Sequence, residues 1–402
     1  TSEPGSGTAW ACPYRGLLPF DVEDAPWFFG RERLVAETIA RLASRPVLAV
    51  VGASGSGKSS MVRAGVVPAI QGGVLPRSDA WRVEVTTPGA PRTSELWRLL
   101  NEADRRPGRP PLLIVVDQLE EVFTLGYTDA DREALAQLLE EEVREGARLV
   151  AVVRGDQMAA VAEVPGLARL LGGRDVLVGP IREAELRDAI IRPAGLAGLR
   201  VEDGLVEEVV ADARGATGVL PLVQTALLET WVHRLGRLLT VEGYRSSGGV
   251  RGAVARLAER AYDGLSPAEQ DAARRILLRL ADATADGRHD LRRRVPRSEM
   301  APAGDTAAWS AFEHLVQHRL LAADDEAVEV SHEALLREWP RLRGWLEDDV
   351  TGRRLHQRLS EGARAWVDDG RDPASLLRGG RLGSTEDWAA GDPEALNDLE
   401  RE

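Results

Sequence analysis

The chain has 402 residues, of which 44% are hydrophobic and 29% are charged, and its formal net charge is −13. A chain of this length exceeds what one compact core holds, so we expect about two to four globular domains. The acidic balance disfavours duplex nucleic acid as the main ligand, and the single cysteine, Cys12, excludes an internal disulfide and a multi-cysteine zinc site.

The composition of residues 1–24 predicts a polar leader before the first domain. This segment has neither the basic start nor the apolar stretch of a secretory signal, and no apolar run of the chain is long enough to cross a bilayer. We therefore expect a cytoplasmic protein with no membrane partner. Because the sequence does not begin with Met, we also expect a fragment of a longer protein.

Strand and helix patterns alternate over residues 25–180, which predicts an α/β domain with a mostly parallel sheet. Most of the strand patterns are continuous apolar runs, as expected for strands that are covered on both faces. The predicted strands are residues 46–51, 81–87, 112–116, 147–154 and 175–179, and the predicted helices are residues 31–42, 58–70, 93–103 and 129–146.

After residue 180 the pattern becomes mostly helical. Ser266 and Glu269 form a capping box that starts one helix. A helix at 306–320, a pair of short strands within 320–331 and a further helix favour a winged-helix arrangement. The predicted domains in this part are an all-helical domain (181–285), a winged-helix domain (286–350) and a C-terminal helical extension (351–402).

The segment GASGSGKSS, residues 52–60, fits the pattern G-x-x-x-x-G-K-[ST] and contains Lys58, the only lysine of the chain. Glycines let backbone N–H groups turn toward phosphate oxygens, and the next helix directs its positive end at them. Lys58 supplies a compact ammonium for the β- and γ-phosphates, where the planar guanidinium of Arg is too bulky. The alternative is a glycine-rich turn without a ligand. The candidate nucleotide-binding residues are Gly52, Ala53, Ser54, Gly55, Ser56, Gly57, Lys58, Ser59 and Ser60.

An acidic stretch follows the predicted strand at 112–116. An acid at the carboxyl end of a strand beside a phosphate loop can hold Mg²⁺, so Asp117 and the hydroxyl of Ser59 are the candidate metal residues. Glu120 or Glu121 is then the candidate catalytic residue that orients or deprotonates water. Without the phosphate loop, such a run would indicate a solvated helix start.

Arg154 ends the predicted strand at 147–154. In a parallel sheet this end of the strand faces the bound nucleotide, so Arg154 is a candidate catalytic residue that contacts the γ-phosphate. The alternative is a surface ion pair, because the chain contains many other arginines.

With these features the chain resembles the STAND NTPases (signal transduction ATPases with numerous domains). It is most similar to the bacterial novel STAND branch, which often precedes WD-repeat propellers. The resemblance covers about Cys12 to Glu402. The matching stretches are CPYRGLLPFDVEDAPWFFGRE, GASGSGKSS, LLIVVDQLEEVFTL, LVAVVRGD, GVLPLVQTALLETW and VEVSHEALLREWPRLRGWL.

The resemblance implies an AAA-like P-loop NTPase domain that binds ATP or ADP with Mg²⁺. It implies a closed ADP-bound state, an open ATP-bound state that self-associates through the NTPase module, and slow, regulatory hydrolysis. Effector and sensor domains would lie outside this fragment. The site residues that it implies are Phe28, Phe29, Gly30 and Arg31 along the adenine and ribose, Arg154 at the γ-phosphate, Pro221 on the base and His332 at the β-phosphate of ADP.

Three functional hypotheses follow from these patterns. The first is the nucleotide-controlled signalling switch. The second is an AAA-like ATPase whose winged helix binds DNA. Its only support is the basic run at 288–297, so we do not expect nucleic acid as a partner. The third, a metabolic nucleotide kinase, fails because no second-substrate site is visible after the phosphate-loop domain. Without the resemblance, His332 would indicate a solvated helix cap.

Overall fold

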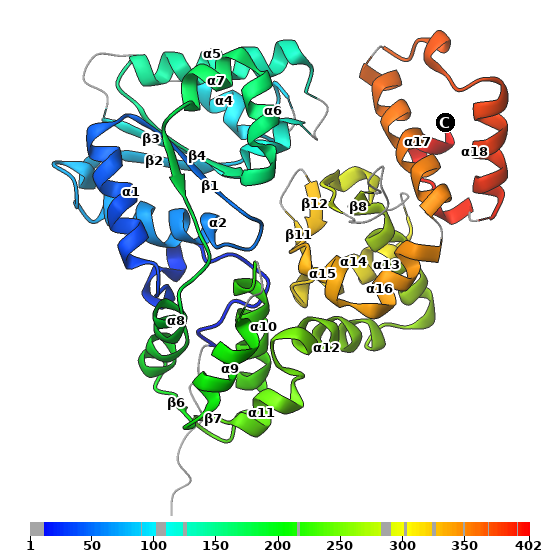
Figure 1. The fold of residues 1–402 in the computed structure, drawn as a ribbon. Helices are drawn as coiled ribbons and strands as arrows, with labels where there is room; N and C mark the ends of the chain where they lie inside the picture. Colours follow the sequence, from blue (N-terminus) through cyan, green and yellow to red (C-terminus); the bar gives the residue numbers. More distant parts are fainter. Residues whose placement is uncertain are drawn as a thin grey trace, which may run out of the picture. The chain divides into compact units, whose positions relative to one another are not determined.

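The computed structural model describes residues 12–89, 91–101, 110–123, 127–214, 218–282, 291–300, 304–323, 327–348, 350–368, 370–391 and 393–402 (Figure 1). The chain forms two compact units, Thr1–Val250 and Arg251–Glu402. Each unit is described by itself. No helix in the described ranges combines the length and the apolar character that crossing a membrane requires.

A five-stranded parallel sheet forms the centre of the first unit, with the strand order β2-β3-β4-β1-β5. Parallel strands end at the same edge of a sheet, so the loops after β1, β3 and β4 come together there. In the register of β1 and β4, Gly52 lies opposite Arg154. The strands are β1 (Val47–Gly52), β2 (Arg82–Thr86), β3 (Leu112–Val116), β4 (Arg148–Arg154) and β5 (Asp175–Leu177).

Helices cover both faces of this sheet (Figure 1). Successive side chains of β1 point to opposite faces, so Val47, Ala49 and Val51 join one apolar core and Leu48 and Val50 join the other. This confirms the predicted parallel α/β domain. The helices of one face are α1 (Glu32–Ser44), α2 (Lys58–Ser60), the π-helix η2 (Met61–Val66) and α3 (Val67–Gln71), and those of the other are α4 (Glu95–Asn101), α5 (Asp129–Arg144), α6 (Met158–Glu163) and α7 (Pro165–Leu171).

The helix predicted at 58–70 is present, but its middle turns are a π-helix. The N–H of Val67 donates to the carbonyl oxygen of Val62, five residues earlier. Pro68 follows directly and has no N–H to donate, so the usual spacing of helix hydrogen bonds does not continue through it. The wider turns lie immediately after α2 (Lys58–Ser60).

Part of the segment predicted as a leader packs into the first unit. Tyr14, Leu17 and Phe20 are buried, and the hydroxyl of Tyr14 donates to the carbonyl oxygen of Ile190, 2.9 Å away. Residues 1–11 lie outside the described residues. A 3-10 helix, η1 (Val22–Trp27), then leads into α1.

The rest of the first unit is mainly helical, as predicted after residue 180. Two short parallel strands interrupt the helices, which the sequence analysis did not predict. The elements are α8 (Glu183–Leu196), β6 (Arg200–Val201), α9 (Leu205–Ala213), α10 (Leu220–Val232), β7 (Leu238–Leu239) and α11 (Val241–Ser246). The helix α12 (Gly249–Asp263) then continues into the second unit.

The second unit combines helices with short antiparallel strands. The predicted capping box starts α13, where the N–H of Ser266 donates to Glu269 at 2.8 Å. The predicted strand pair within 320–331 is present, and a third strand extends it to the sheet β10-β12-β11. The elements up to this sheet are α13 (Pro267–Arg279), β8 (Ala281–Asp282), β9 (Leu291–Arg292), β10 (Val295–Pro296), the 3-10 helix η6 (Arg297–Glu299), α14 (Thr306–Gln317), β11 (Leu321–Ala323) and β12 (Ala327–Val330).

Helices complete the second unit after this sheet, in agreement with the predicted helical C-terminal part. In Figure 1, α17 and α18 lie side by side. The elements are α15 (Ala334–Glu338), α16 (Pro340–Asp348), α17 (Val350–Asp368), η7 (Pro373–Ser375), α18 (Gly379–Gly391), η8 (Pro393–Ala395) and α19 (Asp398–Arg401).

Candidate phosphate-binding site

The loop between β1 and α2 has a backbone that requires glycine. Gly55 and Gly57 have φ angles of 70° and 88°, which L side chains rarely adopt. At Gly52 an added Cβ would lie 2.6 Å from the carbonyl oxygen of Val178, so a side chain has no room there. The three glycines of this loop therefore have a structural reason, and such a backbone can turn N–H groups toward an anion.

Polar groups of this loop are arranged for an anionic ligand. The side chain of Lys58 is only 8% exposed, and its Nζ donates to the carbonyl oxygen of Ala53 at 2.8 Å. The Oγ atom of Ser56 is buried and has no hydrogen-bond partner within the described residues. A buried ammonium and an unpartnered hydroxyl in the same glycine-rich loop fit phosphate oxygens.

Asp117 lies next to the loop, as the sequence predicts. It follows β3 and is 2% exposed, and its Oδ1 accepts a hydrogen bond from the Oγ of Ser59 at 2.8 Å. A carboxylate and a hydroxyl are hard oxygen donors of the kind that Mg²⁺ prefers. The next residue, Gln118, has a φ angle of 53°, and such backbone conformations in residues other than glycine often occur at functional sites.

Arg63 completes this cluster, and the sequence analysis missed it. Its Nε donates to Oδ2 of Asp117 at 3.0 Å, and its Nη1 donates to Asp21 at 3.1 Å. Burial alone would lower the pKa of Arg63, but the charges of Asp117 and Asp21 raise it above its ordinary value. One helical turn separates Arg63 from Ser59, and this spacing is the sequence signal that could have revealed it.

The two candidate catalytic glutamates differ in their surroundings. Both belong to the 3-10 helix η4 (Leu119–Phe123). The Oε2 atom of Glu120 accepts a hydrogen bond from the backbone N–H of Arg154 at 3.2 Å. Glu121 is 6% exposed, and its charge contributes to the raised pKa of Tyr127, after the larger effect of burial. Glu120 is thus tied to the end of β4, where Arg154 begins the next loop.

Arg154 lies at the predicted edge of the sheet, but its guanidinium is engaged locally. Its Nε and Nη2 donate to the two oxygens of Asp156 at 3.1 and 2.8 Å. These hydrogen bonds are the main reason that the pKa of Asp156 lies below its ordinary value. A γ-phosphate contact by Arg154 would therefore have to replace or share the carboxylate of Asp156.

Arg31 contacts the phosphate loop itself. It is 6% exposed, and its Nη2 donates to the carbonyl oxygens of Ser56 and Gly179 at 2.9 and 3.0 Å. Its Nη1 lies 3.6 Å from Glu185. Burial is the main cause that lowers the pKa of Arg31. Gly30 precedes it with a φ angle of 87°, and a Cβ there would overlap the backbone of Glu185.

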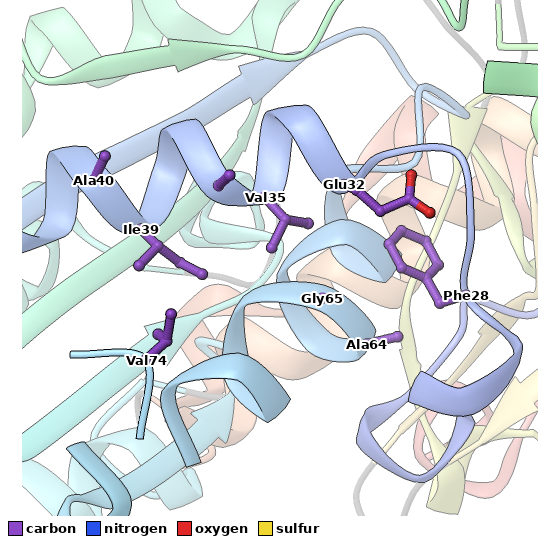
Figure 2. Close-up of a pocket in the computed structure, with 9 residues that line it drawn as sticks. Phe28, Glu32, Val35, Ile39, Ala40, Ala64, Gly65 and Val74 are labelled. Atoms are coloured by element: carbon purple, nitrogen blue, oxygen red, sulfur yellow. The ribbon is translucent and has the colours of Figure 1, made fainter. Parts of the chain in front are cut away.

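The two phenylalanines before Gly30 have different surroundings. The ring of Phe28 packs edge-to-face on Phe20, with 5.8 Å between centroids. Phe28 also lines one end of an apolar groove of about 410 Å³ between α1 and η2, and Val74 lines the other end (Figure 2). The guanidinium of Arg192 instead lies over the ring of Phe29, 4.2 Å from the ring centroid.

The start of α10 lies against the phosphate loop. A Cβ added to Gly55 would be 2.6 Å from the carbonyl oxygen of Gly218, and one added to Gly57 would be 3.0 Å from Leu220. Pro221 follows in the first turn of α10. The segment that contains Pro221 is thus brought to the loop in the first unit.

His332 belongs to the second unit, between β12 and α15. Its Nδ1 accepts a hydrogen bond from the N–H of Ala334 at 3.0 Å, so the ring caps the start of a helical turn. Its contact with a nucleotide stays a prediction.

Comparison with known proteins supports the resemblance inferred from the sequence. The family model described as "Novel STAND NTPase 1" matches residues 13–374. None of the curated proteins matches the sequence. Similar solved structures include a Walker-type ATPase of Pyrococcus abyssi (14% identity, TM-score 0.40, covering 81% of this chain and 98% of that one) and the ORC1 protein of Aeropyrum pernix in complex with DNA (18%, 0.43, 81% and 94%). A third is the RuvB Holliday junction branch migration motor of Thermotoga maritima (14%, 0.39, 78% and 95%).

Proposed function

This chain belongs to the novel STAND NTPase 1 family, and on that premise we propose that it is a signalling switch that binds ATP or ADP and hydrolyses ATP slowly. The observation that carries the proposal is the cluster at the carboxyl edge of the sheet. There, Lys58 lies in a glycine cradle, and Ser59 is hydrogen-bonded to Asp117. This arrangement suits a nucleotide phosphate chain and a divalent cation.

In this proposal each residue of the cluster has one task. Lys58 leaves Ala53 and holds the β- and γ-phosphates, while Ser59 and Asp117 hold Mg²⁺, which would neutralise phosphate charge. Glu120 or Glu121 orients the attacking water. Arg154 contacts the γ-phosphate and gives up its hydrogen bonds to Asp156. The exchange is possible because the phosphate, like the carboxylate of Asp156, offers two oxygens to the guanidinium.

The switch itself involves the segments after the sheet. We assign residues 25–180 to the nucleotide-binding domain, 181–285 to a helical domain, 286–350 to a winged helix and 351–402 to a helical extension. Pro221 and His332 would hold ADP in a closed state. ATP would open the protein and let it self-associate in the cytoplasm, where a sensor domain would supply the input and an effector domain the output.

The nucleotide retained by the purified chain tests this proposal. We expect ADP in an equimolar amount when freshly purified protein is denatured and the released nucleotide is separated by chromatography. His332→Ala should reduce the retained ADP and favour self-association, measured by light scattering with ATP. Arg337→Ala, an exposed change on α15, is the matched control. An empty site with rapid ATP turnover would contradict the switch and indicate a cycling ATPase.

The alternative of a DNA-binding winged helix has little support in the described residues. Residues 288–290 of its basic run lie outside them. In the remainder, Arg292 lies 3.5 Å from Glu329, and the guanidinium of Arg297 lies 5.2 Å from the centroid of Phe312. These side chains make contacts within the second unit.

A further inference from the structure

The second unit contains a cavity of about 430 Å³ between α13, α16, α17 and α18. Its size is in the range of pockets that bind small molecules. It is lined by residues of the second unit alone, and it shares none with the phosphate-binding site. Of its described lining residues, only Arg293 belongs to a segment that a functional hypothesis from the sequence uses, namely the basic run at 288–297.

The lining of this cavity is strongly basic. Arginine supplies five of the thirteen lining residues, namely Arg274, Arg275, Arg279, Arg293 and Arg353, and no described lining residue is acidic. The whole chain is acidic, with 64 Asp and Glu residues against 51 Lys and Arg. A low-dielectric concavity lined by one sign of charge concentrates ligands of the opposite sign, so the cavity favours an anion.

One wall of the cavity is held rigidly. Arg279 is 6% exposed, and its Nη1 lies 2.8 Å from Glu400, which is 1% exposed. Glu400 is also hydrogen-bonded to the Nε2 of His356 and to the backbone N–H of Asn397. Glu400 therefore neutralises Arg279 and fixes it in place. The other arginines of the lining come from α13, α17 and the segment after β9, and of these Arg275 lies 3.8 Å from Asp305.

Aromatic side chains line the same cavity. Trp345 comes from α16 and Trp388 from α18, and both are half-buried. The guanidinium of Arg274 lies 5.9 Å from the centroid of Trp345, and His356 lies 4.8 Å from Trp388. Indole rings beside arginines provide stacking surfaces for a planar ring and charge for phosphates.

We propose that this cavity is a second ligand site, which binds a small anion that carries both phosphate groups and a planar ring, such as a nucleotide. A cavity of about 430 Å³ suits a small molecule better than an extended chain. Arginine recognises phosphate through paired N–H donors, and the two indoles select for the ring. This site is independent of the phosphate-binding loop, so it can be tested with that loop disabled.

The experiment is equilibrium dialysis of the full chain with labelled ATP, in a Lys58→Ala background. We expect one ATP per chain to remain bound, with an affinity that weakens as salt is added. Arg274→Glu should weaken it at least about tenfold, because a charge-assisted contact is lost. Arg337→Glu makes the same charge change on α15 and should leave the affinity unchanged. Trp388→Phe preserves the charge and should weaken binding less than Arg274→Glu does.

Each outcome decides the proposal. Absence of ATP binding in the Lys58→Ala chain would overturn it, and so would equal effects of Arg274→Glu and Arg337→Glu. ATP that still binds at the phosphate-binding loop would not be affected by Arg274→Glu. Failure of the second-site proposal is therefore distinct from failure of the proposed signalling switch. If poly-glutamate bound more tightly than ATP, the ligand of this cavity would be an acidic peptide and not the proposed small anion. Circular dichroism of each variant shows that it has folded.

Discussion

The phosphate-binding loop of the first unit and the basic cavity of the second unit both contain positively charged side chains. One segment of the chain supplies them in the loop, and several segments supply them in the cavity. In the loop, one continuous run of residues 52–60 provides the backbone N–H groups and Lys58. In the cavity, arginines from α13, α17 and the segment after β9 meet only in the folded unit. A local run can be recognised from sequence, whereas a distributed set depends on the packing that brings it together.

The two regions also differ in how they compensate buried charge. Lys58 donates to a backbone carbonyl, so its ammonium can exchange that partner for phosphate. Arg279 is paired with the buried carboxylate of Glu400, and breaking this pair leaves a buried charge. Substitution of Lys58 should therefore impair ligand binding, whereas substitution of Arg279 should impair folding of the second unit.

The largest effect is expected from Arg279→Ala. Loss of one partner of a buried ion pair costs about 3–5 kcal/mol, because Glu400 is left buried without its main partner. The second unit should unfold at a lower temperature, while nucleotide binding by the first unit persists. Calorimetry of the full chain measures both. Arg358→Ala, an exposed change on α17, is the control, and equal transitions for the two variants would refute the role of the pair.

Lys58→Ala should weaken ATP and ADP binding at the phosphate-binding loop by about 100-fold, because a charge-assisted contact to two phosphates is lost. Lys58→Arg keeps the charge but not the shape, so it should rescue only part of the affinity. Isothermal titration measures both variants. Wild-type affinity in Lys58→Arg would show that charge alone is sufficient in the loop, and the stated reason for the single lysine would be wrong.

The pH dependence of the second unit follows from Glu400. Burial would raise its pKa, but hydrogen bonds from His356 and Arg279 hold the pKa well below its ordinary value. A depressed pKa contributes stability above the pKa of the unfolded chain, near about 4.3, and this contribution is lost as the pH falls. Wild type should be more stable than Glu400→Gln by about 2 kcal/mol at neutral pH. A difference that stays constant as the solution is acidified below pH 4.3, about the ordinary Glu pKa, would contradict this assignment.

The sequence predicted the parts of the first unit that depend on local pattern. The buried strands, the loop glycines and the place of Asp117 follow from apolar runs and from the rule that parallel strands end together. The sequence analysis missed Arg63 because its role depends on a hydrogen bond to Asp117, which is distant in sequence. The cavity of the second unit was missed for the same reason. The roles of Glu120, Glu121 and His332 stay predictions.

The predicted role of Arg31 can be tested with two ligands. The resemblance implies a contact along the adenine and ribose, and in the structure its guanidinium donates to the carbonyl oxygen of Ser56 in the loop. Arg31→Ala should weaken nucleotide binding by about tenfold. If Arg31 positions the loop, tripolyphosphate and ATP lose affinity equally; if it contacts the base, only ATP does. Competition titrations with the two ligands distinguish these roles, and Arg33→Ala, at an exposed position, is the control.

The smallest effect is expected from removing Asp156, the ion-pair partner of Arg154. Asp156 is half exposed, so its pair with Arg154 is worth little, and Asp156→Ala should change the preference for ATP over ADP by only about two- to fivefold. The direction is toward ATP, because a γ-phosphate no longer competes with a carboxylate for the guanidinium. Asp156→Asn, which keeps one acceptor oxygen, should give an intermediate value. A preference that moves toward ADP would show that Asp156 holds Arg154 in its working position rather than away from it, and the pair would then belong to the ATP-bound state.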